Sequence, residues 1–211
     1  MPAMPSLSQL RAAHEPLLLL DAASERVQVG YFRGGGAFDW TGSDAEAGVG
    51  LFRCIEELSV DIGAVRAFAF CEGPGSILGI RTAAMALRTW GVLSPRPFFA
   101  YTSLGLFARA LCGPGWAAIA DARRGHWHHC VPGGPVTRVA HASLTGNLKM
   151  PEGFRHWSPL PEGVTIVPYV LPYLFALAPD ADLFRPVAQP DAFLHEEPQY
   201  ATWTPMLHRA P

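Results

Sequence analysis

Glu72-Gly-Pro-Gly-Ser-Ile-Leu-Gly-Ile-Arg81 is the stretch that decides the fold of this chain. The run before it, Ala67-Phe-Ala-Phe-Cys71, is apolar and typical of a buried strand, while the small residues behind it, Thr82 to Leu87, predict a helix. Its glycines permit backbone conformations that residues with a Cβ avoid, and its proline fixes the direction of the turn. A strand, a tight turn and a helix in this order indicate an α/β protein.

The glycine turn is compatible with two uses. A helix N-terminus leaves backbone N–H groups unpaired, and these either hold an anion or make a tight packing contact with another chain. The turn lacks the Lys-Ser/Thr ending of a P-loop and the G-x-G-x-x-G spacing of a dinucleotide site. Ser76 also suits the N-cap of the following helix. The residues of this glycine loop are Gly73, Pro74, Gly75, Ser76, Gly79 and Arg81.

The string from Gly73 to Arg81 resembles the Gly-Pro-Gly-Ser-Phe-Thr-Gly-Leu-Arg signature of the TsaB (YeaZ) family, a glycoprotease-like (peptidase M22-like) group. Members of this family are bacterial subunits of the machinery that adds threonylcarbamoyl to adenosine in tRNA. Three more segments fall in the family's order: Leu17–Ser24 resembles its opening strand, Pro97–Leu104 its strand before a Ser-Thr-Leu helix start, and Ala118–Gly125 its Ile-Asp-Ala-Arg-Arg-Gly turn.

The chain also departs from the family pattern. Ile77-Leu78 stands where the family has Phe-Thr, and Ala22 stands where it has Thr. Tyr200-Ala-Thr occupies the place of a Tyr-Leu-Arg strand near the end, without the residues that usually follow it. The chain is therefore either a divergent TsaB or a descendant that has lost the original partner.

The resemblance implies an α/β fold of the actin-like ATPase (ASKHA) class, made of two ribonuclease-H-like lobes of which the second is reduced. We expect a flexible leader over residues 1–15, an N-terminal lobe over 16–112 with the glycine loop and the interface helices, and a shortened C-terminal lobe over 113–211. From Pro132 onward the chain holds 13 of its 20 prolines, so the elements there must be short. No internal repeat is visible in the sequence.

Local patterns add detail to this outline. Ser43-Asp-Ala-Glu46 fits a capping box at the start of a helix, and Thr102 or Ser103 suits the cap of a later one. Alternating apolar residues or short apolar runs predict strands at 17–20, 27–32, 37–40, 116–120, 126–131 and 165–169.

The resemblance also implies a function. The chain would be a non-catalytic scaffold that stabilises and activates a TsaD-type enzyme in threonylcarbamoylation of the tRNA adenosine next to the anticodon, by preferring the competent conformation of that enzyme. A TsaE-type ATPase is a further candidate partner, tRNA would be reached only through the complex, and a second copy of the chain is the alternative partner. No cofactor is expected. Two other functions stay open: a small ATP-binding phosphotransferase of the same fold, and a diverged homodimer without a tRNA role.

Helices of the N-terminal lobe bind TsaD in this family. Carried over, they are the helix with Leu51 and Leu58 and the helix after the glycine loop. Val49, Met85 and Trp90 fall off the stripes that a core would need, so either a partner covers them or they pack within the monomer. The interface residues implied in this way are Val49, Phe52, Ile55, Ile80, Ala84, Met85, Leu87 and Trp90.

Asp21 ends the opening strand, where ATPases of this fold class position magnesium and phosphate, usually within Asp-x-Gly-Thr. Here the turn is Asp21-Ala-Ala-Ser24, with no glycine to let a phosphate approach the backbone. We favour an aspartate that accepts N–H bonds of its own turn, at the place of a vestigial nucleotide site.

Neither a metal site nor a protease site emerges from the sequence. His126 and His128 would share one side of a strand, with His129 beside them, but zinc needs a third protein ligand and none is evident. The His-x-x-x-His of TsaD is absent. Gly-Pro-Gly-Ser76 is not the Gly-x-Ser-x-Gly elbow of a serine hydrolase, and no histidine–acid pair can be assigned to it.

The composition of the chain limits which functions and cellular locations we expect. A net charge of -2 argues against an extended phosphate-binding face, and Arg123-Arg124 alone do not make one. The cysteines form no C-x-x-C pair, which favours reduced, buried thiols. The first residues do not resemble a signal peptide, and no apolar run reaches spanning length. We therefore expect a cytoplasmic protein without membrane contact.

Overall fold

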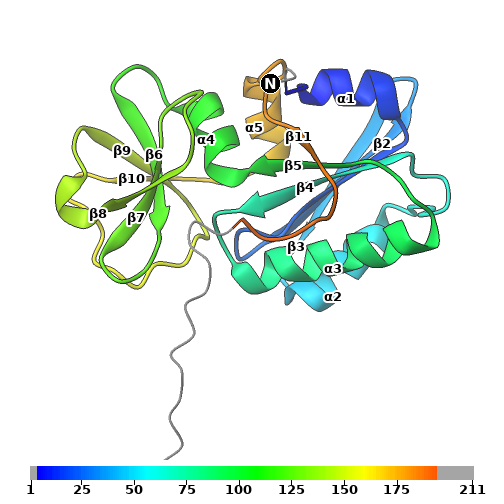
Figure 1. Cartoon of the computed structure of the whole chain (residues 1–211), viewed down its shortest axis with the longest axis horizontal. Helices are drawn as coiled ribbons and strands as arrows, with labels where there is room; N and C mark the ends of the chain where they lie inside the picture. Colours follow the sequence, from blue (N-terminus) through cyan, green and yellow to red (C-terminus); the bar gives the residue numbers. More distant parts are fainter. Residues whose placement is uncertain (1–3, 194–211) are drawn as a thin grey trace, which may run out of the picture.

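The structure is a computed structural model, and it describes residues 4–193. Two lobes, each built on a mixed sheet, lie side by side (Figure 1). The strand order is β11-β5-β4-β1-β2-β3 in the first sheet and β10-β9-β6-β7-β8 in the second. The strand expected at Tyr200 lies outside the described residues.

The elements of the first lobe are α1 (Leu7–His14), β1 (Leu17–Asp21), β2 (Val27–Gly34), β3 (Ala37–Ser43), α2 (Ala47–Glu57), β4 (Ala67–Gly73), α3 (Ile77–Leu93), β5 (Phe98–Thr102) and β11 (Arg185–Val187). Those that follow β5 are α4 (Ser103–Leu111), β6 (Trp116–Asp121), β7 (His126–Cys130), β8 (Thr137–Ala140), η1 (His141–Ser143), β9 (Asn147–Pro151), β10 (Thr165–Val167) and α5 (Leu171–Leu177). The strands predicted from alternation and apolar runs are confirmed at these places.

The two lobes repeat one topology. In each, the first three strands form an antiparallel meander, and the fourth and fifth strands add parallel to the first. Strands β1 to β5 thus correspond to β6 to β10, and α4 after β5 corresponds to α5 after β10. This is the pair of ribonuclease-H-like lobes that was expected, and the repeat is structural although the sequence does not display it.

The second lobe is reduced at two connections. Between its third and fourth strands, the turn η1 stands where the first lobe has α2. Between its fourth and fifth strands, the loop over 152–164 stands where the first lobe has α3. Prolines at 159 and 161 in this loop are consistent with the absence of a helix there, because proline interrupts helical hydrogen bonding.

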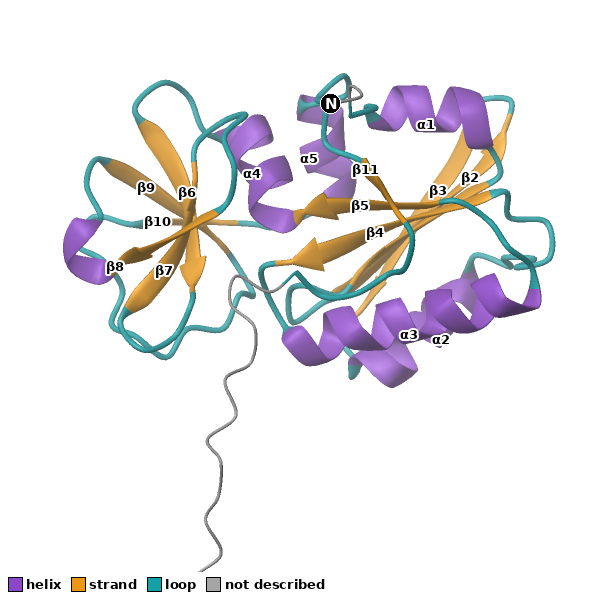
Figure 2. Ribbon diagram, in the orientation of Figure 1, coloured by secondary structure: helices purple, strands orange, loops and turns teal. Residues whose placement is uncertain are grey.

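The first sheet is buried on both faces, and alternate side chains of β1 show what covers each face. Leu18 and Leu20 point into the core shared with α2 and α3, while Leu17 and Leu19 point into the core shared with α1, α4 and the second lobe. All four side chains are fully buried. Figure 2 shows α2 and α3 together on one face of the sheet, with α1 and α5 on the opposite face.

The leader predicted over residues 1–15 is wrong for most of its length, because residues 7–14 form α1. Ser6 caps this helix in a capping box with Gln9, and Leu7 and Leu10 are buried. The guanidinium of Arg11 lies 5.0 Å from the ring centroid of Phe32. The prolines before and after the helix bound it without interrupting it.

The capping box predicted at Ser43–Glu46 is also wrong. Ser43 is still the last residue of β3, paired with Val27, and its Oγ accepts a bond from the N–H of Ala45 at 3.2 Å. The helix starts at Ala47, and its N-cap Glu46 makes no side-chain cap bond. Of the two caps proposed for α4, Thr102 is the one used, since its Oγ1 accepts from the N–H of Gly105 at 3.2 Å.

The end of the chain returns to the first lobe, so residues 113–211 do not all belong to the second. Strand β11 pairs antiparallel with β5 and becomes the outer strand of the first sheet. Arg185 in β11 forms an ion pair with the buried carboxylate of Glu72 at the end of β4. Arg88 of α3 donates to the carbonyl of Pro190 and contacts Asp191. This strap over residues 184–193 fixes the edge of the first lobe.

Candidate protein-binding surface on helices α2 and α3

The glycine loop is a packing contact inside this chain. Gly73 and Gly75 have φ values of 113° and 154°, which residues with a side chain rarely adopt. The N–H of Ser76 donates to the carbonyl of Ala23 at 2.7 Å, and Ser76 Oγ caps α3 at the N–H of Gly79. The sequence left open an anion site or a packing contact with another chain, and the structure shows a further use, which is a packing contact with the chain's own β1–β2 turn.

Close approach explains two of the glycines. A Cβ on Gly75 would lie 2.3 Å from the carbonyl oxygen of Ala23, and a Cβ on Gly79 would lie 2.2 Å from that of Ala22. Both distances are far inside van der Waals contact with backbone atoms that cannot move away. The loop thus presses α3 against the turn that follows β1 and has no room for a phosphate on that side.

Asp21 is enclosed in the same region. Its Oδ2 accepts bonds from the hydroxyls of Tyr101 at 2.6 Å and Tyr169 at 2.8 Å, and its Oδ1 accepts from the N–H of Ala23 at 2.8 Å. The residue is fully buried, and this burial raises the pKa of its carboxyl although the three bonds act in the opposite direction. A carboxylate with both oxygens occupied and no exposed surface is a structural group, as expected for an aspartate that accepts turn N–H bonds.

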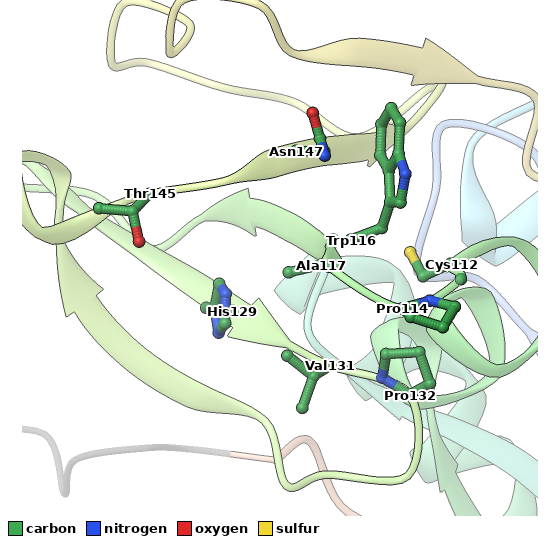
Figure 3. A pocket seen from close by; sticks show the side chains of 11 residues that line it. Cys112, Pro114, Trp116, Ala117, His129, Val131, Pro132, Thr145 and Asn147 are labelled. Atoms are coloured by element: carbon green, nitrogen blue, oxygen red, sulfur yellow. The ribbon is translucent and has the colours of Figure 1, made fainter.

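The histidines of β7 lie apart from this region. No group of three or more metal-ligating side chains occurs among residues 4–193. Burial lowers the pKa of His129, which lines an open hollow of the second lobe together with Trp116, Val131 and Asn147 (Figure 3). The other lining side chains are mostly apolar or proline.

The eight predicted interface residues divide into two sets. One set is buried and supports the surface from beneath. Ile55 and Leu87 lie in the core between the two helices and the sheet, Ile80 belongs to the core on the sheet's other side, and Ala84 is also buried. The other four, Val49, Phe52, Met85 and Trp90, reach the surface at least in part. Trp90 is the most covered of these, because its ring stacks on Phe68 and meets Phe52 edge-on.

A ridge along α3 was missed by the sequence reasoning. Leu78, Met85 and Val92 are 78%, 61% and 84% exposed, and they recur at intervals of seven residues. A seven-residue interval places side chains in one row along a helix, as in a helix–helix seam. The seven-residue spacing is readable in the sequence, but the buried stripe of α3 is also apolar, so composition does not distinguish the outer row from the core.

Two threonines extend this ridge without making it polar. Thr82 Oγ1 donates to the carbonyl of Leu78, and Thr89 Oγ1 donates to that of Met85, both at 2.9 Å. Each hydroxyl is thereby satisfied within α3. What the threonines add to a contact surface is then chiefly their methyl groups. We call Val49, Phe52, Leu78, Thr82, Met85, Thr89 and Val92 the docking face.

The charged side chains of α3 form one row beside the ridge. The charged residues of α3 are Arg81 and Arg88, again seven residues apart, and the helix has no acidic residue. Arg88 is held by the strap through Pro190 and Asp191, whereas Arg81 is exposed. The apolar row therefore runs between α2 on one side and a basic row on the other, with Arg81 as the member of the glycine loop that faces solvent.

Two solved structures share this architecture. One is an uncharacterized protein from Pseudomonas aeruginosa described as similar to peptidase YeaZ, with a TM-score of 0.54, 20% sequence identity, and coverage of 77% of this chain and 89% of that one. The other is YeaZ from Pseudomonas aeruginosa, with a TM-score of 0.56, 22% identity, and coverage of 77% and 90%.

This chain has the YeaZ fold. The two-lobed actin-like fold that the family resemblance implied is thereby confirmed. No protein-family model and no curated protein matches the sequence. Among the described residues, no helix is both long enough and apolar enough to cross a membrane. Within the YeaZ fold, the docking face lies on the helices that the family resemblance singled out.

Proposed function

We propose that this chain is a TsaB-type subunit, a non-catalytic protein that binds a TsaD-type enzyme and supports threonylcarbamoylation of tRNA. The YeaZ fold and the four motif segments in family order support this proposal. The observation that carries it is the exposed ridge on α3, because a row of large apolar side chains in water is costly unless another surface covers it.

The geometry of the ridge indicates what kind of partner surface fits. Three apolar side chains at intervals of seven match the seam by which one helix packs along another. Burying a side chain of this size completely contributes about 1.5 to 3 kcal/mol, so the three together can sustain a specific contact. Val49 and Phe52 on α2 widen the surface. A pair of helices from the partner would complete a bundle with α2 and α3.

The enclosure of Asp21 favours a scaffold over the phosphotransferase alternative. A group that positions magnesium must present a free oxygen, and both oxygens of Asp21 accept bonds from this chain. The glycine loop is equally occupied by the turn after β1. The contribution of the chain to the reaction would then be binding-linked: contact with the competent form of the enzyme raises the population of that form.

Co-expression with the TsaD homologue of the same organism, followed by gel filtration, tests the proposal. Wild-type chain is expected to co-elute with that enzyme. Met85→Glu places a carboxylate on the ridge and should weaken the complex by about 30-fold or more, since a charge at the centre of an apolar contact is left unpaired. Trp90→Glu is a poor test, because Trp90 stacks on Phe68 within the fold.

The matched control is Tyr173→Glu. Tyr173 is 55% exposed on α5, on the other side of the first sheet, and the change introduces the same charge. Equal co-elution of wild type and Met85→Glu, or equal loss with Tyr173→Glu, would contradict the proposal. A wild-type chain that elutes as a homodimer and ignores the enzyme would instead favour the diverged homodimer.

A further inference from the structure

Asp121 positions two side chains from different parts of the second lobe. Its carboxylate accepts bonds from the backbone N–H groups of Arg123, Trp157 and Ser158, the last two at 2.6 and 2.7 Å. Burial raises the pKa of this carboxyl, but the N–H bonds outweigh it and the pKa is lowered overall. One carboxylate thus ties the β6–β7 turn to the loop that follows β9.

The result is an exposed stack of a cation on an indole. The guanidinium of Arg123 lies 4.1 Å from the ring centroid of Trp157, and Trp157 is 61% exposed. Arg123 and Arg124 both adopt left-handed backbone conformations, with φ of 62° and 52°. Residues other than glycine take this conformation at a cost, and such strain is retained where the surroundings fix it. Here the bond from the N–H of Arg123 to Asp121 holds the first of the two residues.

Charged groups of both signs surround the stack. Arg155 pairs with Glu25, and the charge of Asp121 is directed at three N–H groups. Within residues 4–193, Arg123 and Arg124 are in no ion pair. Trp157 and Arg155 also line an open hollow beside the stack, together with His156 and two acids, Glu25 and Glu152.

We propose that this surface, formed by Arg123, Arg124 and Trp157, binds a single-stranded RNA loop. An exposed indole stacks on an unpaired base, and guanidinium groups contact the neighbouring phosphates. The inference rests on the proposed function, which places the chain in a complex that acts on tRNA. It goes beyond that function by giving the chain its own RNA contact, where tRNA was expected only through the complex.

The sequence alone does not indicate this RNA-binding surface, because its residues come together only in the folded chain. Two adjacent arginines are not a nucleic-acid site, and the net charge of the chain is -2. The aromatic member is 34 positions away along the chain, and only folding brings Trp157 over Arg123. The surface is small, so it suits one or two nucleotides of a loop and not a duplex.

Fluorescence anisotropy with a labelled RNA hairpin tests this inference on the full chain. The probe is a hairpin with a single-stranded loop, and the comparison is a blunt duplex with the same number of nucleotides. The hairpin should bind more tightly. Trp157→Leu should weaken hairpin binding about tenfold and leave duplex binding nearly unchanged, because it removes the stacking surface only.

Removing the arginines should change both the affinity for the hairpin and its dependence on salt. The double variant Arg123→Gln, Arg124→Gln should weaken hairpin binding about tenfold or more and reduce the salt dependence by close to two phosphate contacts. Arg66→Gln, an exposed arginine just before β4, serves as the control and should bind as wild type. Absence of hairpin binding at low salt, equal affinity for hairpin and duplex, or equal loss in the control would overturn the inference.

Failure of this inference is separable from failure of the proposed function. The turn variants leave the docking face intact, so they should still co-elute with the TsaD homologue. If they lose co-elution while hairpin binding is unchanged, the surface contacts protein and not RNA, and the inference is wrong. If Met85→Glu loses co-elution and hairpin binding is still loop-dependent, both proposals stand.

Discussion

Asp21 and Asp121 occupy the same position in the two lobes, each as the last residue of its lobe's first strand. In both turns the carboxylate accepts the N–H of the residue two positions on. Their surroundings differ completely, because Asp21 lies beneath Tyr101 and Tyr169 whereas Asp121 holds backbone at the surface. One turn design thus packs the lobes together in the first case and presents side chains in the second.

The buried carboxyl of Asp21 should make stability depend on pH. Its raised pKa means that the folded state holds the proton more tightly than the unfolded state, whose value is near 3.8. Stability contributed by this group is therefore present at low pH and is lost as pH rises through the raised pKa. Asp21→Asn cannot titrate, so the stability of wild type relative to this variant should fall with rising pH, by at most about 1.4 kcal/mol per pH unit. Urea unfolding of both proteins between about pH 4 and pH 8 measures this difference. A constant or rising difference would rule out the assigned titration.

Gly79→Ala should destabilise the fold although it lies in a helix. Alanine normally favours a helix over glycine by about 1 kcal/mol, but here its Cβ would meet the carbonyl oxygen of Ala22 at 2.2 Å. We expect a net loss of about 2 kcal/mol or more in the free energy of unfolding. Gly48→Ala in α2 is the control, since nothing lies within 4 Å of its added Cβ, and it should gain up to about 1 kcal/mol. Thermal or urea unfolding distinguishes the two, and a stabilised Gly79→Ala would disprove the close contact.

The threonines of the docking face should tolerate loss of their hydroxyls. Because Thr82 and Thr89 satisfy their hydroxyls within α3, valine at both positions keeps the same outward shape. Affinity for the TsaD homologue should change by about twofold or less, whereas aspartate at both positions should reduce it about tenfold or more. Calorimetric titration of the two double variants provides the comparison. Strong loss with valine would mean that the hydroxyls bind the partner.

The strap should contribute to stability through Arg185. Glu72 is only 5% exposed, and although burial raises its pKa, Arg185 opposes that rise. Arg185→Gln leaves a buried carboxylate without its cation and should cost about 1 to 2 kcal/mol, a modest figure because Arg185 is half exposed to solvent. In a double-mutant cycle with Glu72→Gln, the second change should recover part of that loss. Additive losses would show that the ion pair is not coupled.

The sequence predicted the first lobe well because its signals are local. Apolar alternation placed β1 to β3, and the glycine turn fixed the order of β4 and α3. Ser76 was assigned as a cap correctly and Thr102 was one of two candidates, since a cap depends on a side chain and a backbone group three residues away. Family motifs supplied the pairing of the strands, which periodicity alone cannot give.

Features that depend on distant contacts were missed. Helix α1 is amphipathic but short, and its Leu7 and Leu10 need a sheet surface that only the folded lobe provides. Strand β11 has three residues and contains a proline, so no sequence pattern predicts it. Its pairing with β5 joins positions far apart in the chain. Four predicted interface residues proved to be core, because a helix stripe facing the sheet and one facing solvent can be equally apolar.

The position of β11 bears on how the protein is made. During synthesis the first five strands of the first sheet leave the ribosome long before Arg185 to Val187. The edge of β5 therefore has no partner strand until almost the entire second lobe has been synthesised. An amino-terminal half expressed alone would keep that edge open to strands of other molecules. We therefore expect that dividing the gene between the two lobes yields aggregation-prone fragments.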